Sequence, residues 1–413
     1  MNKDIPFVET IPLHWSVIPN RYLFYYDGKK VGEEHEKYQL LSLTTNGVKE
    51  RDINAAGGKV PASYDNYQTV KKGQMVFCLF DLDCSAVFSG ISNYDGMITS
   101  AYDVFSTTSK IDKEYADYWF KYIYSNRYYK MYSKNIRYTI TSDLFRSLKT
   151  PVPPMDEQKQ IGIFLREQER KIDALIANVQ EQIEKLKAYK QSLITEVVTK
   201  GLDPNVPMKD SGVEWIGEIP SSWNTIRVKQ LLRERKERSV DGKEEPLSMS
   251  QKVGLVPTKT LDSIPNMASS FVGAKLAYVD DLVFNKLKAH LGVFSVSKYD
   301  GLVSPDYAVY YSTGVADLKY LEYLFKTPQC ISEFRKRSTG IAAGLTRLYT
   351  DGLFAIECPF PSKDEQHEIV AHLNKKCAQI DELTAIKQTK IEKLEQYKRS
   401  LIYEYVTGKK EVS

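Results

Sequence analysis

The chain has 413 residues; 42% of them are hydrophobic, 27% are charged, and the formal net charge is +4. Because a single core seldom grows beyond about 250 to 300 residues, this length predicts two or three domains. The sequence has no apolar run near the roughly 18 residues of a membrane-spanning helix and no apolar signal-peptide core, and its five scattered cysteines favour free thiols in a reducing cytoplasm. The small net charge permits a DNA-binding protein without requiring one, so the distribution of charge has to decide.

The first segment of the chain, residues 20–150, is predicted to be an α/β body. Short β-rich runs such as Gln74–Phe80 are broken by Gly, Asp and Asn, and an apolar, aromatic helix is expected over Tyr115–Tyr124. Residues 121–150 carry a net charge of about +6, with tyrosines between the basic side chains. Such a run is often only a solvated face, but it also suits phosphate contacts. The candidate DNA-contacting residues of this segment are Lys130, Lys134 and Arg137.

A long helix is predicted over residues 153–200. Asp156 follows two prolines as a candidate N-cap, and Gly201 lies just beyond the end. At about 1.5 Å per residue the helix would span roughly 65 Å, which is too long for one small core, so we expect a coiled coil. The alternative is an amphipathic helix that lies on its own domain. The residues assigned to the coiled-coil seam and to subunit docking are Ile172, Leu175, Val179, Leu186 and Leu193, with Ile380, Leu383, Leu394 and Leu401 in a second helix near the C-terminus.

The second helix repeats the first at an offset of 208 residues. About 24 of some 50 aligned positions are identical between residues 151–200 and 359–408, and the motif Ile-Pro-x-x-Trp occurs ahead of each body, ending at Trp15 and at Trp223. Between these matched parts the two halves diverge. The chain is therefore an internal duplication, in which the matched helices serve something common to both halves and the variable bodies answer to two different targets.

The second variable segment, residues 225–358, is also predicted to be an α/β body. Strands expected over Leu282–Asn285 and Ala308–Tyr311 precede an apolar helix over Leu318–Phe325. Residues 326–350 carry a net charge of about +4, at the place that corresponds to the basic run of the first half. Two such runs at matching places favour a phosphate-contacting surface. The candidate DNA-contacting residues here are Lys286, Lys288, His290, Arg335, Lys336, Arg337, Ser338, Thr339 and Arg347.

The sequence offers no catalytic or metal-binding constellation. The glycine patterns of dinucleotide-binding and phosphate-binding loops are absent, and the five histidines have no metal-ligand spacing. Ser304-Pro-Asp-Tyr307 is only superficially similar to the Asn/Asp-Pro-Pro-Tyr motif of adenine methyltransferases, because the leading amide and the second proline are missing. We therefore expect no catalytic residue, no metal and no cofactor on this chain.

The matched segments closely resemble the specificity subunit of type I restriction-modification systems. An Asp-Glu-Gln start and a long helix ending Lys-Leu-x-x-Tyr-Lys-x-Ser-Leu-Ile-x-Glu-x-Val-Thr occur at 156–199 and 364–407. Between the copies lies Asp210-Ser-Gly-Val-Glu-Trp-Ile-Gly-Glu-Ile-Pro-x-x-Trp223. The resemblance covers essentially the whole chain, and only the leader ahead of Trp15 departs from the family pattern.

This resemblance implies an α+β fold with two α/β target recognition domains separated by two long antiparallel coiled-coil helices in a pseudo-two-fold repeat. Each domain would read one half of a bipartite site in double-stranded DNA, and the helices would set the spacing and dock two methylation subunits, which restriction subunits would join. The chain itself would be non-catalytic and cytoplasmic, with S-adenosylmethionine, ATP and Mg²⁺ on the partner subunits and no membrane contact. The implied boundaries are 1–152 for the first recognition domain, 153–200 for the central spacer helix, 201–360 for a linker and the second recognition domain, and 361–413 for the C-terminal spacer helix.

Two other hypotheses are weighed against this one. A coiled-coil scaffold that organises proteins without touching DNA would not need divergent bodies with paired basic runs. An enzyme fused to a spacer is disfavoured by the missing motifs. Trp15 and Trp223 are expected to be core anchors of the two bodies rather than DNA contacts.

Overall fold

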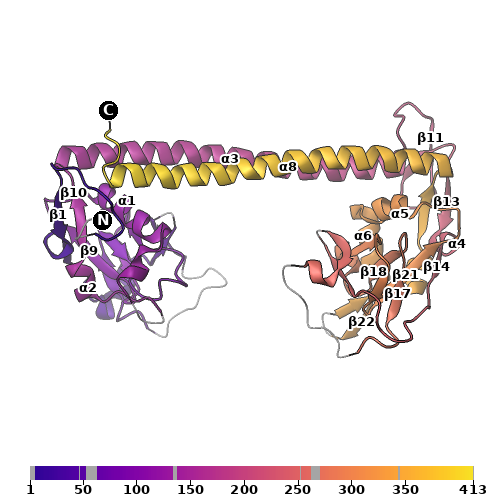
Figure 1. Ribbon diagram of the computed structural model, residues 1–413, viewed down its shortest axis with the longest axis horizontal. Coiled ribbons are helices and arrows are strands. Elements are labelled where there is room, and N and C mark those ends of the chain that lie inside the picture. The colour runs from indigo at the N-terminus through magenta and orange to yellow at the C-terminus, as the bar shows by residue number, and fades with distance from the viewer. Residues whose placement is uncertain are drawn as a thin grey trace. The chain divides into compact units, whose positions relative to one another are not determined.

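The computed structural model describes residues 5–45, 47–52, 63–133, 137–251, 253–261, 270–342 and 345–412, without the side chains of residues 341, 342 and 345. The chain divides into two compact units (Figure 1). Unit 1 comprises Met1–Gln180 and Gln388–Ser413, and unit 2 comprises Glu181–Lys387. Each unit therefore combines one body with one end of each long helix, α3 (Met155–Lys200) and α8 (Lys363–Val406).

Unit 1 is built around a four-stranded antiparallel sheet in the order β2-β9-β6-β7, flanked by paired strands β1-β10, β3-β4 and β5-β8. Helix α1 packs beside β7, and its first turn is capped by the carboxylate of Asp112, which accepts from the amides of Glu114 and Tyr115 at 2.9 and 3.1 Å. The elements of this body are β1 (Ser16–Pro19), β2 (Phe24–Tyr26), β3 (Leu41–Thr44), β4 (Gly47–Glu50), β5 (Gln68–Val70), β6 (Met75–Phe77), β7 (Ser89–Ile91), β8 (Gly96–Ile98), β9 (Asp103–Thr107), α1 (Lys113–Ser125), α2 (Ser142–Ser147) and β10 (Lys149–Val152).

Unit 2 repeats this plan with the sheet order β14-β21-β18-β19 and flanking pairs β13-β24, β15-β16, β17-β20, β11-β12 and β22-β23. Asp317 caps α5 as Asp112 caps α1, accepting from the amides of Lys319 and Tyr320 at 2.7 and 3.3 Å. The elements of this body are β11 (Met208–Asp210), β12 (Glu218–Pro220), β13 (Asn224–Arg227), α4 (Val228–Leu231), β14 (Leu232–Glu234), β15 (Leu247–Ser250), β16 (Gly254–Pro257), β17 (Lys275–Ala277), β18 (Leu282–Asn285), β19 (Phe294–Val296), β20 (Gly301–Val303), β21 (Tyr307–Ser312), α5 (Leu318–Phe325), α6 (Pro328–Arg337), β22 (Thr339–Ala342), β23 (Leu345–Arg347), α7 (Thr350–Phe354) and β24 (Glu357–Phe360).

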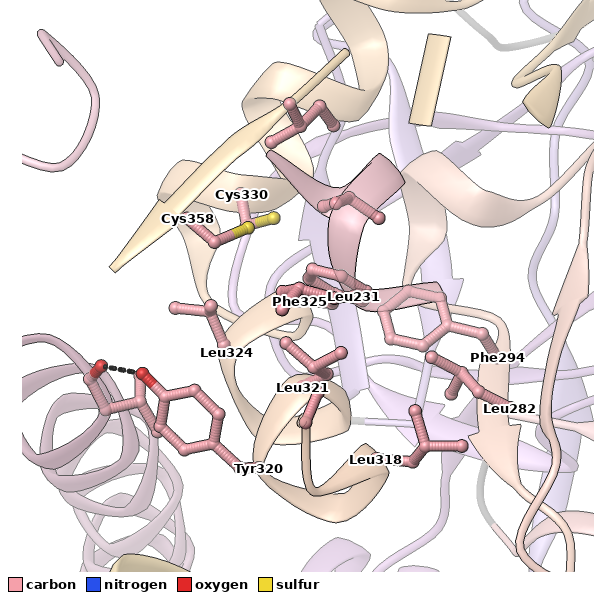
Figure 2. Close-up of a cluster of buried hydrophobic side chains, with 14 of the residues drawn as sticks. Leu231, Leu282, Phe294, Leu318, Tyr320, Leu321, Leu324, Phe325, Cys330 and Cys358 are labelled. Atoms are coloured by element: carbon pink, nitrogen blue, oxygen red, sulfur yellow. Dashed lines mark hydrogen bonds between the residues drawn. The ribbon is translucent and has the colours of Figure 1, made fainter. Parts of the chain in front are cut away.

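Aromatic and aliphatic side chains fill the core between sheet and helices in each unit. In unit 2, Leu282 and Phe294 of the sheet meet Leu321 and Phe325 of α5, and all four are buried (Figure 2). In unit 1 the ring of Phe77 lies 4.9 Å from that of Phe120 and contributes to the corresponding cluster. Each core continues onto the long helices, so body and helix ends form one hydrophobic unit.

Each body is fastened to the long helices by contacts that occur twice in the chain. In unit 1, Trp15 Nε1 donates to Glu157 of α3 at 3.0 Å, and Gln158 Oε1 accepts from the Asp112 amide at 2.7 Å. In unit 2, Trp223 donates to Glu365 at 2.9 Å and Gln366 accepts from the Asp317 amide at 2.8 Å. Both tryptophans are buried, as expected for core anchors. The duplication read from the sequence is thus a duplication of contacts.

The start of helix α3 differs from the prediction. Helix α3 begins at Met155, so Asp156 lies in the first turn rather than at the N-cap, where its charge still complements the positive helix end. At the other end, Gly201 follows the last helical residue with φ of 81°, a left-handed conformation that glycine adopts without a Cβ penalty. Gly408, after α8, has φ of 69°.

The two long helices run antiparallel within each unit. In unit 1 the carboxylate of Asp173 on α3 accepts from Lys398 Nζ on α8 at 2.8 Å, and the rings of Phe164 and Tyr405 lie 4.6 Å apart. In unit 2 Lys190 Nζ donates to Asp381 at 2.6 Å. The Asp173–Lys398 and Lys190–Asp381 pairs correspond to each other through the offset of 208 residues, so both ends of the helix pair have the same register.

The buried stripe of the helix pair differs from the predicted seam at two positions. Leu175 and Leu383 are 50% and 48% exposed, so the prediction that they lie in the seam is wrong. The buried positions continue instead through Ile183 and its repeat Ile391, each 5% exposed. The reason is that the second seam position follows Ile172 by four residues, at the partly buried Ile176, rather than by three. Of the other assigned residues, Ile172, Val179, Ile380 and Leu401 are buried and Leu186, Leu193 and Leu394 are half-buried.

The motif Tyr-Asp-Gly occurs in both bodies, at residues 94–96 and 299–301, and its glycine marks a close approach of two backbones. A Cβ on Gly301 would lie 2.2 Å from the carbonyl oxygen of Glu245, and one on Gly96 would lie 2.3 Å from that of Gln39. The residues that follow, Leu302 and Met97, donate their amides to the same carbonyls. Glycine is therefore required at both places.

We predict that Gly301→Ala destabilises the protein by about 1 to 3 kcal/mol, because the added methyl group forces these backbones apart. Urea unfolding monitored by tryptophan fluorescence measures the change. Gly340→Ala is the matched control, since no described atom lies within 4 Å of its Cβ. A Gly301→Ala protein as stable as the wild type would contradict the prediction.

Candidate nucleic-acid interface

In unit 1 the base of the body meets the helix pair through a charged network. Glu169 of α3 accepts from Tyr118 Oη at 2.9 Å and pairs with Lys398 of α8 at 2.9 Å and Lys121 of α1 at 3.5 Å. Burial alone would raise the pKa of Glu169, but the neighbouring ammonium groups lower it below its usual value. Cys377 holds the corresponding place in unit 2, where it is buried. The matched segments are therefore not equivalent at every charged position.

The predicted basic surface of unit 1 is only partly free. Lys130 lies in the short 3₁₀ helix Tyr128–Met131 and is half-buried, with its ammonium 2.8 Å from Asp83 and 4.5 Å from the ring centre of Tyr138. That ion pair holds the pKa of Asp83 below its usual value. Arg137 is exposed, and Lys134 lies outside the described residues. Lys130 is thus tied to its own body, and Arg137 is the candidate whose side chain faces solvent.

The predicted basic surface of unit 2 lies at the end of helix α6. Arg335, Lys336 and Arg337 occupy its last turn and are all exposed. Glu333 pairs with Lys336 at 2.7 Å and with Arg337 at 3.6 Å, whereas the charge of Arg335 is not matched by any ion pair within the described part of the chain. The Ser338 hydroxyl donates to the Phe334 carbonyl at 2.6 Å and so closes the helix, and Thr339 begins β22, exposed.

A second group of candidates lies where strands of unit 2 end. Lys286 and Lys288 follow β18, and Lys288 is exposed, whereas Lys286 and His290, in the 3₁₀ helix Ala289–Leu291, are half-buried. Arg347 of β23 donates from Nη2 to Asp306 at 2.6 Å. Two members of this group, Lys275 and Asp306, were not foreseen from the sequence. Lys275 donates to the Tyr307 carbonyl at 2.6 Å, and burial together with the nearby Lys286 lowers its pKa.

The chemistry of these surfaces is that of charge and hydrogen bonding rather than of a reacting centre. No group of three or more His, Cys, Asp or Glu side chains placed to hold a metal is found across the described residues. In the same part of the chain, every helix is too short or too polar to cross a membrane.

The fold and its surfaces define a class of protein: a duplicated α+β chain in which two divergent bodies with basic surfaces are each fastened to the ends of two antiparallel helices. Solved structures share this fold. One, from work on complex assembly and conformational transition of the type I R-M system, has a TM-score of 0.73 at 13% identity and covers 97% of this chain and 99% of its own. The HsdS subunit from Thermoanaerobacter tengcongensis has a TM-score of 0.54 at 14% identity, covering 97% and 98%. The predicted fold class is confirmed.

The curated relatives of the chain are type I restriction enzyme specificity subunits. The MjaVIII specificity subunit of Methanocaldococcus jannaschii is 24% identical over 288 residues, 65% of this chain and 64% of that protein, so the match spans less than two thirds of the relative. The putative MjaX specificity subunit of the same organism is 25% identical over 311 residues, 73% of this chain and 69% of that protein. No protein-family model matches the chain. The resemblance read from the sequence is confirmed by these relatives.

The lowered pKa of Glu169 predicts how this contact responds to acid. A carboxylate whose folded pKa lies below its unfolded pKa stabilises the fold above about pH 4.5, and the stabilisation is lost as the pH falls through the folded pKa. We expect Glu169→Gln to cost about 1 to 3 kcal/mol at pH 7 and to lose less further stability than the wild type between pH 6 and pH 3.5.

Urea unfolding at pH 7, 6, 5, 4 and 3.5 measures this difference. Glu184→Gln is the control, because Glu184 is exposed and pairs along the helix surface with Lys187 at 2.8 Å. Equal acid sensitivity of Glu169→Gln and the wild type would show that the Glu169 network does not stabilise the fold.

Proposed function

We propose that this chain is the DNA-specificity subunit of a type I restriction-modification complex, in which each body reads one half of a bipartite site in double-stranded DNA. The observation that carries the proposal is that the contacts between bodies and helices occur twice, while the exposed surfaces of the bodies differ. A protein that recognised one symmetric target would need two like surfaces. Two unlike bodies on one repeated frame suit an asymmetric target with two different halves.

The basic surfaces supply the sequence-independent part of this binding. Exposed arginine and lysine side chains such as Arg335 and Arg137 attract phosphates and release counterions from DNA. Base recognition is then left to side chains that are held in fixed positions. This division of labour matches a protein that first slides on DNA and then stops at its site.

The helix pair is proposed to set the spacing between the half-sites. Both helices pass from one unit into the other, and at about 1.5 Å per residue each is long enough to separate two readers by about one 34 Å turn of B-DNA. The DNA between the half-sites would then go unread.

The same helices are proposed to dock two methylation subunits. Leu175 and Tyr397, 50% and 55% exposed, are close in sequence to Asp173 and Lys398, which join the two helices in unit 1. Their repeats, Leu383 and Tyr189, are 48% and 57% exposed and are close in sequence to Asp381 and Lys190, which form the corresponding pair in unit 2. Large apolar side chains exposed in matching pairs favour two copies of one protein partner.

Catalysis belongs to the partners in this proposal. S-adenosylmethionine would be used by the methylation subunits for adenine N6, and ATP with Mg²⁺ by the restriction subunits. The complex would work in the cytoplasm, where its DNA is. This chain supplies the sequence specificity and the helices on which the partner subunits dock.

The phosphate-contacting role of helix α6 predicts a change in salt dependence. We expect Arg335→Glu to weaken binding to all DNA sequences and to lower the slope of log affinity against log salt by about 0.9 for each phosphate that the variant no longer neutralises. Fluorescence anisotropy of the full chain on a duplex of genomic sequence, at several salt concentrations, measures the slope. Lys243→Glu is the control, since Lys243 is exposed and pairs with Asp241 in a turn. An unchanged slope for Arg335→Glu would remove α6 from the interface, and no DNA binding by the wild type would favour the protein scaffold.

The docking surfaces predict a stepwise loss of partners. We expect Leu175→Ser with Tyr397→Ser to reduce the number of methylation subunits per chain from two to one, because only the apolar pair of unit 1 is removed. Native mass spectrometry of the complex purified from the source cells measures the stoichiometry. Ile386→Ser is the matched control, because Ile386 is 58% exposed on α8 and belongs to neither pair. A complex that keeps two subunits would place their docking elsewhere.

A further inference from the structure

Unit 2 contains a charged group whose counterpart in unit 1 is neutral. The group consists of Lys275 on β17, Lys286 after β18, Asp306 before β21 and Arg347 on β23. Two of its members are joined by the 2.6 Å hydrogen bond from Arg347 Nη2 to Asp306. The comparison of the two units decides whether the fold itself requires these charges.

The backbone establishes which residues correspond. The Leu348 amide donates to the Lys286 carbonyl at 3.0 Å, and the Ile140 amide donates to the Leu79 carbonyl at 2.7 Å. Leu348 and Ile140 are both buried, so Arg347 corresponds to Thr139 and Lys286 to Leu79.

The third position follows the same pattern. Lys275 Nζ donates to the Tyr307 carbonyl, and Gln68 Nε2 donates to the Tyr102 carbonyl. Lysine and glutamine thus make the same hydrogen bond to the same place in the two sheets. Unit 1 achieves this local fold with threonine, leucine and glutamine, so the positive charges of unit 2 are not needed to build it. They are available to bind something outside the fold.

The guanidinium of Arg347 is held rather than free. Its side chain is 24% exposed, its Nη2 is bound to Asp306, and its Cζ lies 5.8 Å from the ring centre of the exposed Tyr349. Its Nε is buried without an acceptor among the described residues, so a contact with a partner would have to be made by the terminal Nη1 and Nη2 atoms of the guanidinium. A fixed planar fork with spare donors is suited to directional recognition.

The kind of group that this site binds follows from Arg347 and Asp306 together and not from the arginine alone. Asp306 is 51% exposed, and a carboxylate at the contact would repel a phosphate. A G·C pair, however, presents two acceptors on guanine and an amino donor on cytosine in the major groove. An arginine with an adjacent carboxylate offers the complementary pattern of donors and acceptor.

We propose that Arg347, positioned by Asp306, reads a G·C pair in the half-site bound by unit 2. This inference rests on the proposed function and assigns a specificity-determining residue within it. Among its described residues, the matched surface of unit 1 has no such pair: Phe80, 41% exposed, stacks on Tyr102 there with ring centres 6.2 Å apart. The two half-sites are therefore expected to differ at this position.

The test is selection of bound sequences from a pool of randomised duplex DNA by the full chain in its purified complex. The wild type is expected to retain a bipartite motif with a G·C pair in one half. Arg347→Gln is expected to lower the preference for that pair at least about fivefold while every other position keeps its preference. Arg347→Lys, which keeps the charge but not the planar fork, is expected to do the same. Asp306→Asn is expected to relax the same position.

Arg227→Gln is the matched control, because Arg227 also binds a carboxylate, Glu357 at 3.2 Å, on the exposed surface of unit 2. The motif is expected to be unchanged in this variant. Retained preference at the remaining positions shows that Arg347→Gln is folded. An unchanged motif for Arg347→Gln would overturn this assignment and leave the proposed function intact. The same holds if Arg347→Gln weakens binding equally on all sequences and Arg347→Lys restores the affinity, because that result indicates a phosphate contact. A wild type that selects no motif would overturn both the proposed function and this assignment.

Discussion

A buried tyrosine hydroxyl in each unit ties the strand that leads into one long helix to the end of the other. Tyr115 donates to the Pro151 carbonyl at 2.8 Å and lies 3.4 Å from that of Val406, and Tyr320 lies 3.2 and 3.0 Å from the carbonyls of Pro359 and Val198. Figure 2 shows the hydroxyl of Tyr320 pointing away from the core of unit 2 toward helix α3, which contains Val198. Burial raises the pKa of both hydroxyls well above the usual value, so they stay protonated. Each body is therefore held by two helices, one of which starts in the other half of the chain.

This constraint explains why the helices match while the bodies diverge. A substitution in a helix near Tyr115 or Tyr320 disturbs the packing of both long helices at once, whereas a substitution on the surface of a body disturbs only that body. Buried polar pairs illustrate the freedom of the bodies. Arg235 binds Asp281 at 2.7 Å in unit 2, and the corresponding residues of unit 1 are Asp27 and Gln74, joined at 2.6 Å, so an acidic residue replaces the arginine and a neutral one replaces the aspartate. The contacts between the bodies and the long helices are the same in both units, while the surfaces of the bodies can change and so acquire new specificity.

Much of the fold could be predicted from the sequence because a repeat is visible without knowledge of structure. The long helices, the two bodies and the anchoring tryptophans all follow from the offset of 208 residues. The seam was misplaced at Leu175 because a step of three and a step of four after Ile172 both land on an apolar residue, and only packing against α8 distinguishes them. The Arg347–Asp306 pair could not be foreseen, since its members are 41 residues apart and meet only through the pairing of strands. The alignment of the two halves does show one sign of it, because Arg347 in the second half is aligned with the neutral Thr139 in the first.

The central claim is that one chain with two unlike bodies gives its complex a bipartite, asymmetric DNA target. A genome-wide map of methylated adenines in the source cells, with and without this gene, tests it most directly. The account predicts a motif of two different half-sites with an unread gap, which disappears when the gene is deleted and returns when it is restored. Persistence of every methylated motif in the deletion strain would contradict it.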